Sequence, residues 1–429
     1  MTSTIEGNNA MSRGSMAIAT FSTIVEWYDF TLYLYFSTVI SRVFFGEGAG
    51  SLLTALAAFA IAYFMRPLGA VAFGHIGDRY GRRRMMLLSV MIMTVATLLT
   101  ALLPTRSSIG PLAGALLLIL RCVMGFSVGG EYTGVVAYLL EGAPSNRRGL
   151  ITSLASAASE IGALLAVAAS ALTTSLMNNA DLEAWGWRIP FFVGSALAGS
   201  VWIARAVMQE SPDFERQQAG ATVPDRPLRH VLRHHRSGVL KGFAISALGS
   251  ITYYVGITYT PAFLTSSGGN GESTALWIAT AAAVLVILVT PLTGALSDRW
   301  GRRPVLILLA LCSIVAPLPM FWLMANGSPI QVMLGAAILA AIAGGVSAVG
   351  AVATAELFPG EGRLTGLALG ATSATAIFGG LTPYLAHLLV VRTGEAMVPG
   401  IMIAIVAACV LPILLRLHET APIAKSSLP

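Results

Sequence analysis

The chain contains the stretch Gly74-His75-Ile76-Gly77-Asp78-Arg79-Tyr80-Gly81-Arg82-Arg83, and 220 residues later it contains Gly294-Ala295-Leu296-Ser297-Asp298-Arg299-Trp300-Gly301-Arg302-Arg303. A second pair of matches recurs at a spacing of 215 residues: Gly129-Gly130, Glu141 and Arg148 against Gly344-Gly345, Glu356 and Arg363. Two matches at nearly one spacing indicate a duplicated unit. Membrane proteins built from such repeats are typically transporters, with a site between the repeats near the middle of the bilayer.

The composition indicates that lipid solvates most of the surface. The 429 residues are 55% hydrophobic and 11% charged, whereas a soluble protein carries about 25% charged residues. This excludes an ordinary soluble enzyme, a disordered chain and a nucleic-acid binder, although the net charge is +6. The three cysteines lie in apolar stretches without disulfide or metal spacing. No enzyme motif or phosphate loop is present, so we expect no enzymatic activity, no metal and no cofactor.

A helix needs about 20 mostly apolar residues to cross the hydrocarbon core. The chain has twelve such stretches, at 15–40, 51–74, 85–104, 111–140, 149–177, 187–209, 239–264, 273–297, 304–325, 330–356, 364–391 and 395–417. Together with the repeat, they predict an all-α polytopic membrane protein of twelve transmembrane helices in two pseudo-symmetric six-helix halves.

The predicted organisation has five parts: a tail at 1–14, a six-helix bundle at 15–209, a linker at 210–238, a second bundle at 239–417 and a tail at 418–429. The two tails, the linker and the loops on their side of the membrane carry about 20 of the 26 basic residues. Because arginine and lysine accumulate in cytoplasmic loops, we expect both termini to be cytoplasmic. The linker holds three histidines among arginines without metal-binding spacing, so it is expected to be a solvated basic loop or a contact to lipid headgroups.

Several motifs carry a family resemblance. The repeated glycine–aspartate–arginine loop resembles the signature loop of the major facilitator superfamily, and Arg121-x-x-x-Gly125-x-x-x-Gly129 resembles its second motif. Further stretches resemble the metabolite–proton symporter family, which includes citrate, 2-oxoglutarate, shikimate and proline/betaine carriers: Glu26-Trp27-Tyr28-Asp29-Phe30, Arg66-Pro67-Leu68-Gly69-Ala70, Gly129-Gly130-Glu131, Trp187-Arg188-Ile189-Pro190-Phe191-Phe192, Glu210-Ser211-Pro212 and Phe378-Gly379-Gly380-Leu381-Thr382-Pro383. The resemblance implies a monomer in a bacterial inner membrane.

The resemblance also implies that the repeated loops form a cytoplasmic gate. Asp78 and Asp298 follow apolar spans and have arginines close by, which suits charge-assisted bonds to arginine or to free N–H groups. Such contacts can form in one conformation and break in another; alternatively, the arginines only fix the topology. The predicted gate residues are Gly74, Asp78, Arg79, Arg82, Arg83, Glu141, Arg148, Asp298, Arg299, Arg302, Glu356 and Arg363.

Charged residues inside the spans indicate the coupling site, because each costs roughly 2.5–3.5 kcal/mol at the centre of a spanning helix. We expect proton coupling to involve Glu26, Asp29, Arg121, Glu160 and Glu131. Movement of Arg121 toward or away from the acids of the first span would change their affinity for a proton. Alternatively, Arg121 forms a static buried pair with them, and Glu160 makes only a local hydrogen bond. Arg66 is expected near a helix end, extending toward the interface.

The second half offers neutral polar groups instead. The predicted substrate-binding residues are Arg121, Tyr33, Glu160, Tyr253, Tyr254, Thr372 and Thr375. We therefore predict a secondary active transporter that moves a small polar metabolite with protons, by alternating access. The resemblance and the bidentate capacity of Arg121 favour an organic acid. The excess of acids inside the membrane would equally suit a betaine- or proline-like zwitterion, and a uniporter or exporter on the same fold is a further alternative. The expected partners are this substrate, the proton as coupling ion and the lipid bilayer.

Overall fold

The computed structural model describes residues 11–46, 49–267, 269 and 272–421. Within these ranges the regular structure is entirely helical. The first half consists of α1 (Arg13–Tyr35), α2 (Ser37–Ile40), α3 (Ala49–Tyr80), α4 (Arg82–Leu102), α5 (Arg106–Ile109), α6 (Leu112–Val128), α7 (Glu131–Gly142), α8 (Arg148–Leu176), α9 (Asn179–Asp181) and α10 (Arg188–Ala206). Of the predicted tails, residues 1–10 and 422–429 lie outside the described part.

Two short helices connect the halves, α11 (Pro212–Ala219) and α12 (Pro227–His234). The second half consists of α13 (Arg236–Tyr253), α14 (Thr260–Ser266), α15 (Glu272–Trp300), α16 (Arg302–Val315), α17 (Pro317–Asn326), α18 (Pro329–Glu356), α19 (Arg363–Leu367), α20 (Ser373–Phe378), α21 (Thr382–Thr393) and α22 (Val398–Leu415). Two π-helical turns, which are wider than α-helical turns, extend α13 toward α14 (Tyr254–Thr258) and connect α19 to α20 (Ala368–Thr372).

The predicted twelve-helix architecture is confirmed. In the described ranges, ten helices or continuous helical segments are long and apolar enough to cross a membrane, and the bent pair α16–α17 adds an eleventh. The bend of 43° occurs where Pro317 begins α17, because proline has no N–H for the helical hydrogen bond. The remaining position belongs to α1, whose apolar character is lowered by Glu26 and Asp29.

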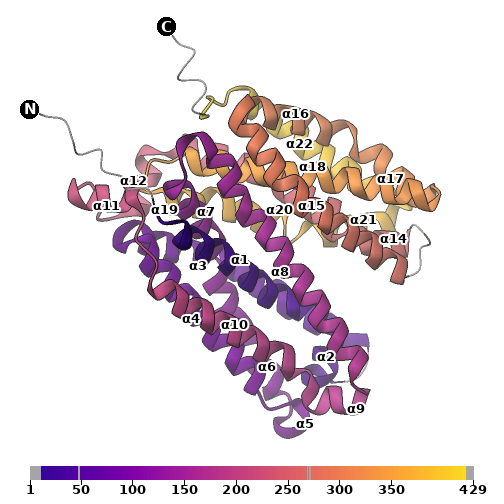
Figure 1. Cartoon of the computed structure of the whole chain (residues 1–429). Coiled ribbons are helices and arrows are strands. Elements are labelled where there is room, and N and C mark those ends of the chain that lie inside the picture. The colour runs from indigo at the N-terminus through magenta and orange to yellow at the C-terminus, as the bar shows by residue number, and fades with distance from the viewer. Residues whose placement is uncertain (1–10, 47–48, 268, 270–271, 422–429) are drawn as a thin grey trace, which may run out of the picture.

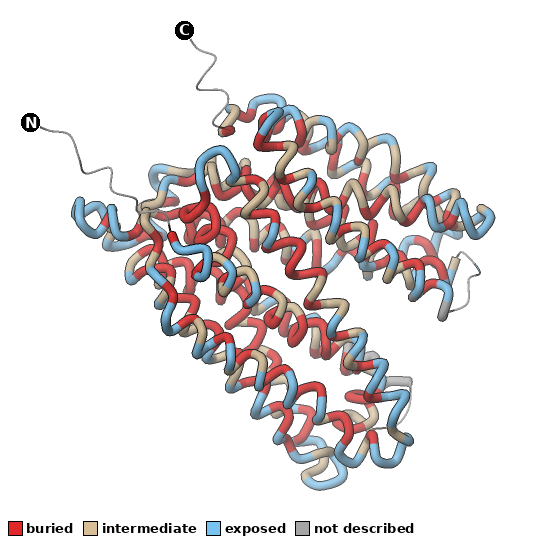
Figure 2. Tube along the Cα trace, in the orientation of Figure 1, coloured by how far each residue is buried: buried red, intermediate tan, exposed pale blue. Residues whose placement is uncertain are grey.

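The two halves lean together at one end and diverge at the other (Figure 1). The start of α1 and the end of α22 lie on the side where the halves meet, which we call the closed end; the opposite side is the open end. At the contact between the halves, α8 packs against α15 and α18, and α3 packs against α19. The exposed residues lie mainly on the outer faces of the helices (Figure 2) and include many large apolar side chains, as expected of helices in lipid.

Glycines bring α3 and α6 unusually close together. A Cβ atom on Gly69 would lie 1.8 Å from the carbonyl oxygen of Phe126, and one on Gly125 would lie 2.1 Å from that of Ala62. Small residues allow helix backbones to approach in this way in membranes. This contact fixes the position of α3 relative to α6, and therefore of Arg66 relative to Arg121.

Candidate functional site

A cavity lies between the two halves. It encloses about 1090 Å³ of space free of protein atoms, including the part open to solvent. Its wall combines the charged side chains of Arg66 and Glu160 with aromatic and hydroxyl groups from both halves. Five of the predicted site residues line it: Glu160, Tyr253, Tyr254, Thr372 and Thr375. The cavity therefore combines charged groups of the first half with hydroxyl groups of the second.

Arg66 lies on the cavity wall rather than near the interface, so the sequence-based placement was wrong. The helix α3 continues past the predicted end at residue 74 to Tyr80, which puts Arg66 well inside the helix. Its guanidinium carbon lies 4.8 Å from the ring centre of Phe30 and 5.7 Å from that of Trp27. Its Nη2 atom lies 3.8 Å from Oε1 of Glu26. An arginine inside an apolar stretch was the signal that could have identified it.

Glu26 is fully buried. Neither of its carboxylate oxygens has a hydrogen-bond partner in the part of the chain that the structure describes. The nearby Arg66 is the cation it faces, at a distance longer than a direct hydrogen bond. A buried carboxylate without hydrogen bonds is costly in its charged form, so this position is suited to accepting a proton.

Arg121 lies deeper in the first half, beyond the cavity wall. Its guanidinium carbon is 4.6 Å from the ring centre of Tyr33. Its Nη1 atom contacts the sulfur of Met124 at 3.0 Å, and its Nη2 atom donates to the carbonyl oxygen of Phe30 at 3.4 Å. The hydroxyl of Tyr33 donates to the carbonyl of Ala55 at 2.9 Å. Arg121 and Tyr33 therefore form one buried cluster next to the cavity.

Asp29 is fully buried on the same helix as Glu26. One of its oxygens accepts a hydrogen bond from Thr97, and the other has no partner among the described residues. Across the described ranges, Arg121 makes no ion pair with a carboxylate. In this conformation Asp29 and Arg121 are near each other but unpaired, so a static pair is not what the structure contains.

Glu131 lies inside the first half in a buried ion pair with Arg205. Ser89 donates a second hydrogen bond to its carboxylate, and Arg205 also donates to the hydroxyl of Ser22. Glu131 is not on the cavity wall. Sequence reasoning did not identify Arg205 as its partner, because the two residues are 74 positions apart.

Two contacts made by tyrosine hydroxyls bridge the halves at the cavity. Tyr253 donates to the carboxylate of Glu160, and the hydroxyls of Tyr63 and Tyr254 lie 2.6 Å apart. Glu160 and Tyr63 belong to the first half, whereas both other tyrosines belong to the second. A molecule in the cavity would therefore meet the guanidinium of Arg66, the carboxylate of Glu160 and hydroxyl groups of both halves.

At the closed end, a carboxylate from each half caps a helix of the other half. Asp78 accepts hydrogen bonds from the backbone N–H groups of Leu364 and Thr365, at 3.2 and 2.8 Å, in the first turn of α19. Asp298 accepts the equivalent bonds from the second and third residues of α8, at 2.8 and 2.9 Å. Free N–H groups and the helix dipole both favour a negative charge at a helix N-terminus. These contacts exist only while the halves are together.

Arginine–glutamate pairs surround the capped helices. Arg82 donates to both oxygens of Glu141, at 3.0 and 3.1 Å, and Arg363 of the second half donates to the same carboxylate at 2.6 Å. Arg363 also reaches Asp213 on α11 at 2.9 Å. This network joins the two halves and the linker.

Among the described residues, the corresponding network of the second half has fewer ion pairs, although Arg302 pairs with Asp298 at 2.8 Å. Arg302 contacts Glu356 at 3.3 Å, but Arg148, the repeat counterpart of Arg363, makes no ion pair with any residue that the structure describes. Arg299 is exposed. On the other side, Arg79 pairs with Asp225 of the linker at 3.2 Å. The predicted gate residue Arg83 donates to the carbonyl of Ala206, and Gly74 approaches the backbone of α19 closely.

Two glutamates missed by sequence reasoning cap the helices that follow the repeated loops. Glu210 accepts from the backbone N–H of Arg82 at 2.9 Å, and Glu419 accepts from that of Arg302 at 2.8 Å. Burial raises the pKa of Glu210, against the opposing effect of backbone hydrogen bonds, of which that from Ser211 is the largest. Each glutamate follows the last span of its half, which is the signal that could have revealed them.

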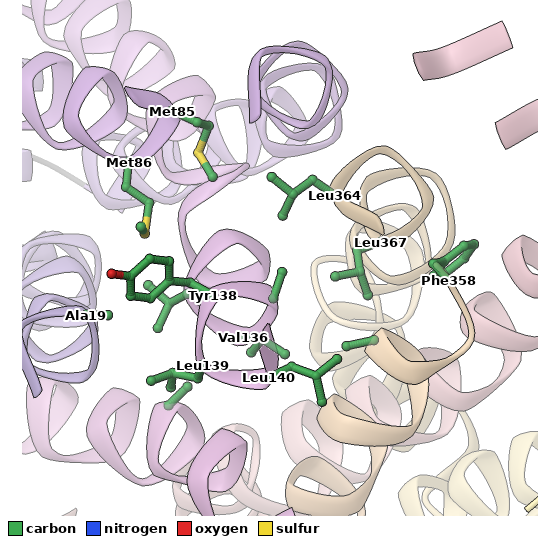
Figure 3. Close-up of a cluster of buried hydrophobic side chains, with 14 of the residues drawn as sticks. Ala19, Met85, Met86, Val136, Tyr138, Leu139, Leu140, Phe358, Leu364 and Leu367 are labelled. Carbon is green, nitrogen blue, oxygen red and sulfur yellow. The ribbon is translucent and has the colours of Figure 1, made fainter. Parts of the chain in front are cut away.

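A cluster of buried apolar side chains from both halves gathers around α7 and α19 (Figure 3). Leu364 and Leu367 of α19 lie in the same buried cluster as Met85, Val136 and Leu140 of the first half. The closed end is therefore sealed by hydrophobic contact as well as by ion pairs.

Two six-helix halves around a central cavity, closed at one end by reciprocal caps, define a membrane transporter that works by alternating access. Residues 15–229 match the model of the sugar (and other) transporter family, and residues 269–428 match that of the Major Facilitator Superfamily. The chain belongs to the major facilitator superfamily. It is a secondary active transporter, and since members of this family are transporters, the prediction that it is not an enzyme is confirmed.

Its relatives include several characterised carriers. The chain is 31% identical over 420 residues to the glycine betaine/proline/ectoine/pipecolic acid transporter OusA of Dickeya dadantii, covering 95% of this chain and 84% of the relative. It is 31% identical to the citrate-proton symporter of Klebsiella pneumoniae (92% and 89% covered) and 34% identical to the alpha-ketoglutarate permease of Escherichia coli (86% and 85% covered). These relatives place it in the metabolite–proton symporter family.

Solved structures show the same fold. The proton:xylose symporter XylE bound to 6-bromo-6-deoxy-D-glucose superposes with a TM-score of 0.79 at 18% identity, covering 95% of this chain and 96% of that chain. The transporter FucP in the outward conformation gives a TM-score of 0.70 at 16% identity, covering 94% and 99%. The chain is therefore a multi-pass membrane protein of this fold.

Proposed function

We propose that the chain is a proton symporter for a small organic acid. The observation that carries the proposal is the pair formed by Glu26 and Arg66, 3.8 Å apart, with Arg66 on the cavity wall. A guanidinium can bind a carboxylate through two parallel hydrogen bonds. The names of the citrate and alpha-ketoglutarate relatives support an organic acid.

Competition for Arg66 couples the substrate to the proton. A substrate carboxylate that engages Arg66 weakens its attraction for Glu26, and the buried Glu26 then takes up a proton rather than remaining an unpaired anion. Asp29 is the second proton site in the proposal, with Arg121 nearby to change its proton affinity as the helices move. Glu131 contributes to proton coupling through its ion pair with Arg205.

A zwitterion is the second candidate, and one specific feature favours it. Glu160 and the ring of Trp27 are also part of the cavity wall. A carboxylate with an aromatic face suits a cationic ammonium group, while Arg66 would hold the carboxylate of the same molecule. The name of the betaine and proline relative agrees with this alternative.

The arginine-rich closed end faces the cytoplasm in this proposal, together with both termini and the linker 210–238. Positive residues concentrate there, as cytoplasmic loops require. The cavity is then closed to the cytoplasm by the Asp78 and Asp298 caps. This arrangement suits inward transport across the inner membrane of a bacterium by a monomer.

The test uses proteoliposomes that contain a pH-sensitive dye. Citrate, 2-oxoglutarate, shikimate, glycine betaine and proline are added separately, and both acidification and radiolabelled uptake are recorded. We expect one class of substrate to enter together with protons. Glu26→Gln should abolish acidification, Arg66→Lys should weaken substrate affinity at least about tenfold, and Glu215→Gln, at an exposed position, should change neither. Uptake without proton movement, or unchanged behaviour of both the Glu26 and the Arg66 variant, would overturn the proposal.

A further inference from the structure

The linker helix α12 presents a dense basic surface beside the contact between the halves. Arg226, Arg229 and Arg233 are exposed, and with His230 and His234 they surround a hollow of about 480 Å³, solvent included. At 100° per residue these five positions fall on one face of the helix. The three arginines make no ion pair with any residue inside the described ranges. A surface of this kind attracts anions.

The neighbouring face of α12 is apolar and exposed. Leu228 and Leu232 are one turn apart, and 36% and 45% of their surfaces are accessible. The transmembrane helix α13 begins at Arg236, directly after α12, so α12 lies at the level where the span leaves the membrane. A short helix with basic and apolar faces at this level is suited to the headgroup region of a bilayer.

A third face of α12 holds the helix against both halves of the transporter. It packs against α3 of the first half and α19 of the second (Figure 1). Val231 is fully buried, and a Cβ atom on Gly362 would lie 2.7 Å from its side chain. Asp225, just before α12, pairs with Arg79 of the first half. Separation of α3 from α19 would therefore force α12 to leave at least one of them.

We propose that the basic face of α12 binds the phosphate headgroup of an anionic phospholipid, and that this binding favours the conformation with the closed end shut. The exposed leucines select a lipid over a free phosphate ion, because they need an apolar phase to cover them. A ligand shifts a conformational equilibrium by its difference in affinity for the two states. When α12 is docked on α3 and α19, its three arginines are held at a fixed place at the membrane surface. Release of the helix ends this fixed placement.

The first measurement is the binding of phosphatidylglycerol and of phosphatidylcholine to the purified full chain by native mass spectrometry. The test variant combines Arg226→Gln, Arg229→Gln and Arg233→Gln. We expect about a fivefold loss of phosphatidylglycerol affinity per arginine, and roughly 100-fold in total. The matched control removes three exposed arginines of the same end with the same change of charge: Arg84→Gln, Arg147→Gln and Arg416→Gln. Equal losses in the two triple variants, or no loss in the first, would overturn the site.

The second measurement separates a lipid from a free anion and tests the effect on conformation. Full-length protein is reconstituted in phosphatidylcholine alone, in phosphatidylcholine with inorganic phosphate, and in equal amounts of phosphatidylcholine and phosphatidylglycerol. Hydrogen exchange of the α12 and α19 amides reports whether the contact is closed. We expect phosphatidylglycerol alone to slow exchange, and only when the α12 arginines are present. The same slowing by inorganic phosphate, or none by phosphatidylglycerol, would refute the proposal.

Discussion

Replacement of Asp78 by asparagine tests whether the reciprocal caps hold the closed end together. The carboxylate is fully buried and accepts hydrogen bonds from the N–H groups of Leu364 and Thr365. It also lies 3.3 Å from the guanidinium of Arg82. Asparagine has nearly the same shape but carries no charge, and only one of its side-chain atoms can accept a hydrogen bond. The variant therefore weakens the cap without creating a cavity.

The magnitude follows from the contacts that are lost. A hydrogen bond to a charged group contributes about 1.5–3 kcal/mol, and a charge at a helix N-terminus contributes about 0.3–1 kcal/mol. Asp78→Asn keeps one bond in weakened form, and Arg82 keeps its bonds to Glu141. We expect the closed conformation to lose about 2–3 kcal/mol, which corresponds to roughly 30- to 150-fold in the ratio of closed to open molecules.

Spin labels at the open end measure this ratio. The helix α5 and the far end of α17 lie there (Figure 1). Ser107 belongs to α5 and Ser328 lies between α17 and α18, and both are exposed. They would be replaced by cysteine after removal of the native cysteines Cys122, Cys312 and Cys409. When the closed end separates in proteoliposomes, the open end should come together, so the Asp78→Asn protein should show a new, shorter distance between the labels.

A surface aspartate provides the matched control. The side chain of Asp225 is 94% exposed and pairs with Arg79; such surface pairs contribute about 0–1 kcal/mol. Asp225→Asn should therefore shift the distance distribution only slightly, while Asp298→Asn should act like Asp78→Asn. The reasoning fails if Asp78→Asn leaves the distribution unchanged or shifts it no further than Asp225→Asn does.

Two further predictions concern packing and the linker. Gly69→Ala should lower the stability by about 1–3 kcal/mol, because the new Cβ atom would lie 1.8 Å from the backbone oxygen of Phe126. Gly199→Ala is the control: no neighbouring atom would lie nearer than 3.9 Å to its Cβ atom, so it should be neutral or stabilising by up to about 1 kcal/mol. Equal melting temperatures for the two variants would contradict this reasoning. Burial lowers the pKa of His235, and two neighbouring histidines lower it further. His235 therefore binds a proton more readily when α12 leaves its docked position. Acidification from about pH 7.5 to about 5.5 should thus weaken the docking of α12 on the two halves. Hydrogen exchange of the α12 amides, measured in an uncharged detergent and corrected for the intrinsic effect of pH, should become faster on acidification in the wild type but much less so in His235→Asn. The same pH dependence in both proteins would disprove the role of His235.

The fold could be predicted because its determinants are local or repeated. Hydropathy identifies apolar spans one at a time, and the match of residues 74–83 to 294–303 reveals the duplication without knowledge of any contact. Asp78 and Asp298 stood out for the same reason. Their partners did not, since the backbone N–H groups of α19 and α8 carry no sequence signal beyond the start of a helix.

Most of the cavity could not be predicted from the sequence because it depends on helix length and rotation. Arg66 was misplaced when α3 was expected to end six residues early, at residue 74 instead of Tyr80. The pairing of Glu131 with Arg205 depends on how α7 and α10 are rotated about their axes. Tyr63 was missed as well, since its hydroxyl contact with Tyr254 crosses between the halves. The residue types could be read from the sequence, but the contact partners of these residues depend on how the helices pack.

The two contacts between the halves differ in what holds them. At α8 and α15 the backbones themselves touch: a Cβ atom on Gly149 would lie 2.4 Å from the carbonyl oxygen of Gly294, and Arg148 contributes no ion pair within the described chain. At α3 and α19, Arg363 bonds two carboxylates and α12 lies across both helices. Both contacts use the same repeated loop, but within the described chain the ion pairs of Arg363 and the linker helix belong to the α3–α19 contact. The α8–α15 contact depends on the Asp298 cap and on close backbone packing. The α3–α19 contact adds ion pairs and the linker helix to its own cap, so its strength can also respond to pH or to an anion bound at the linker.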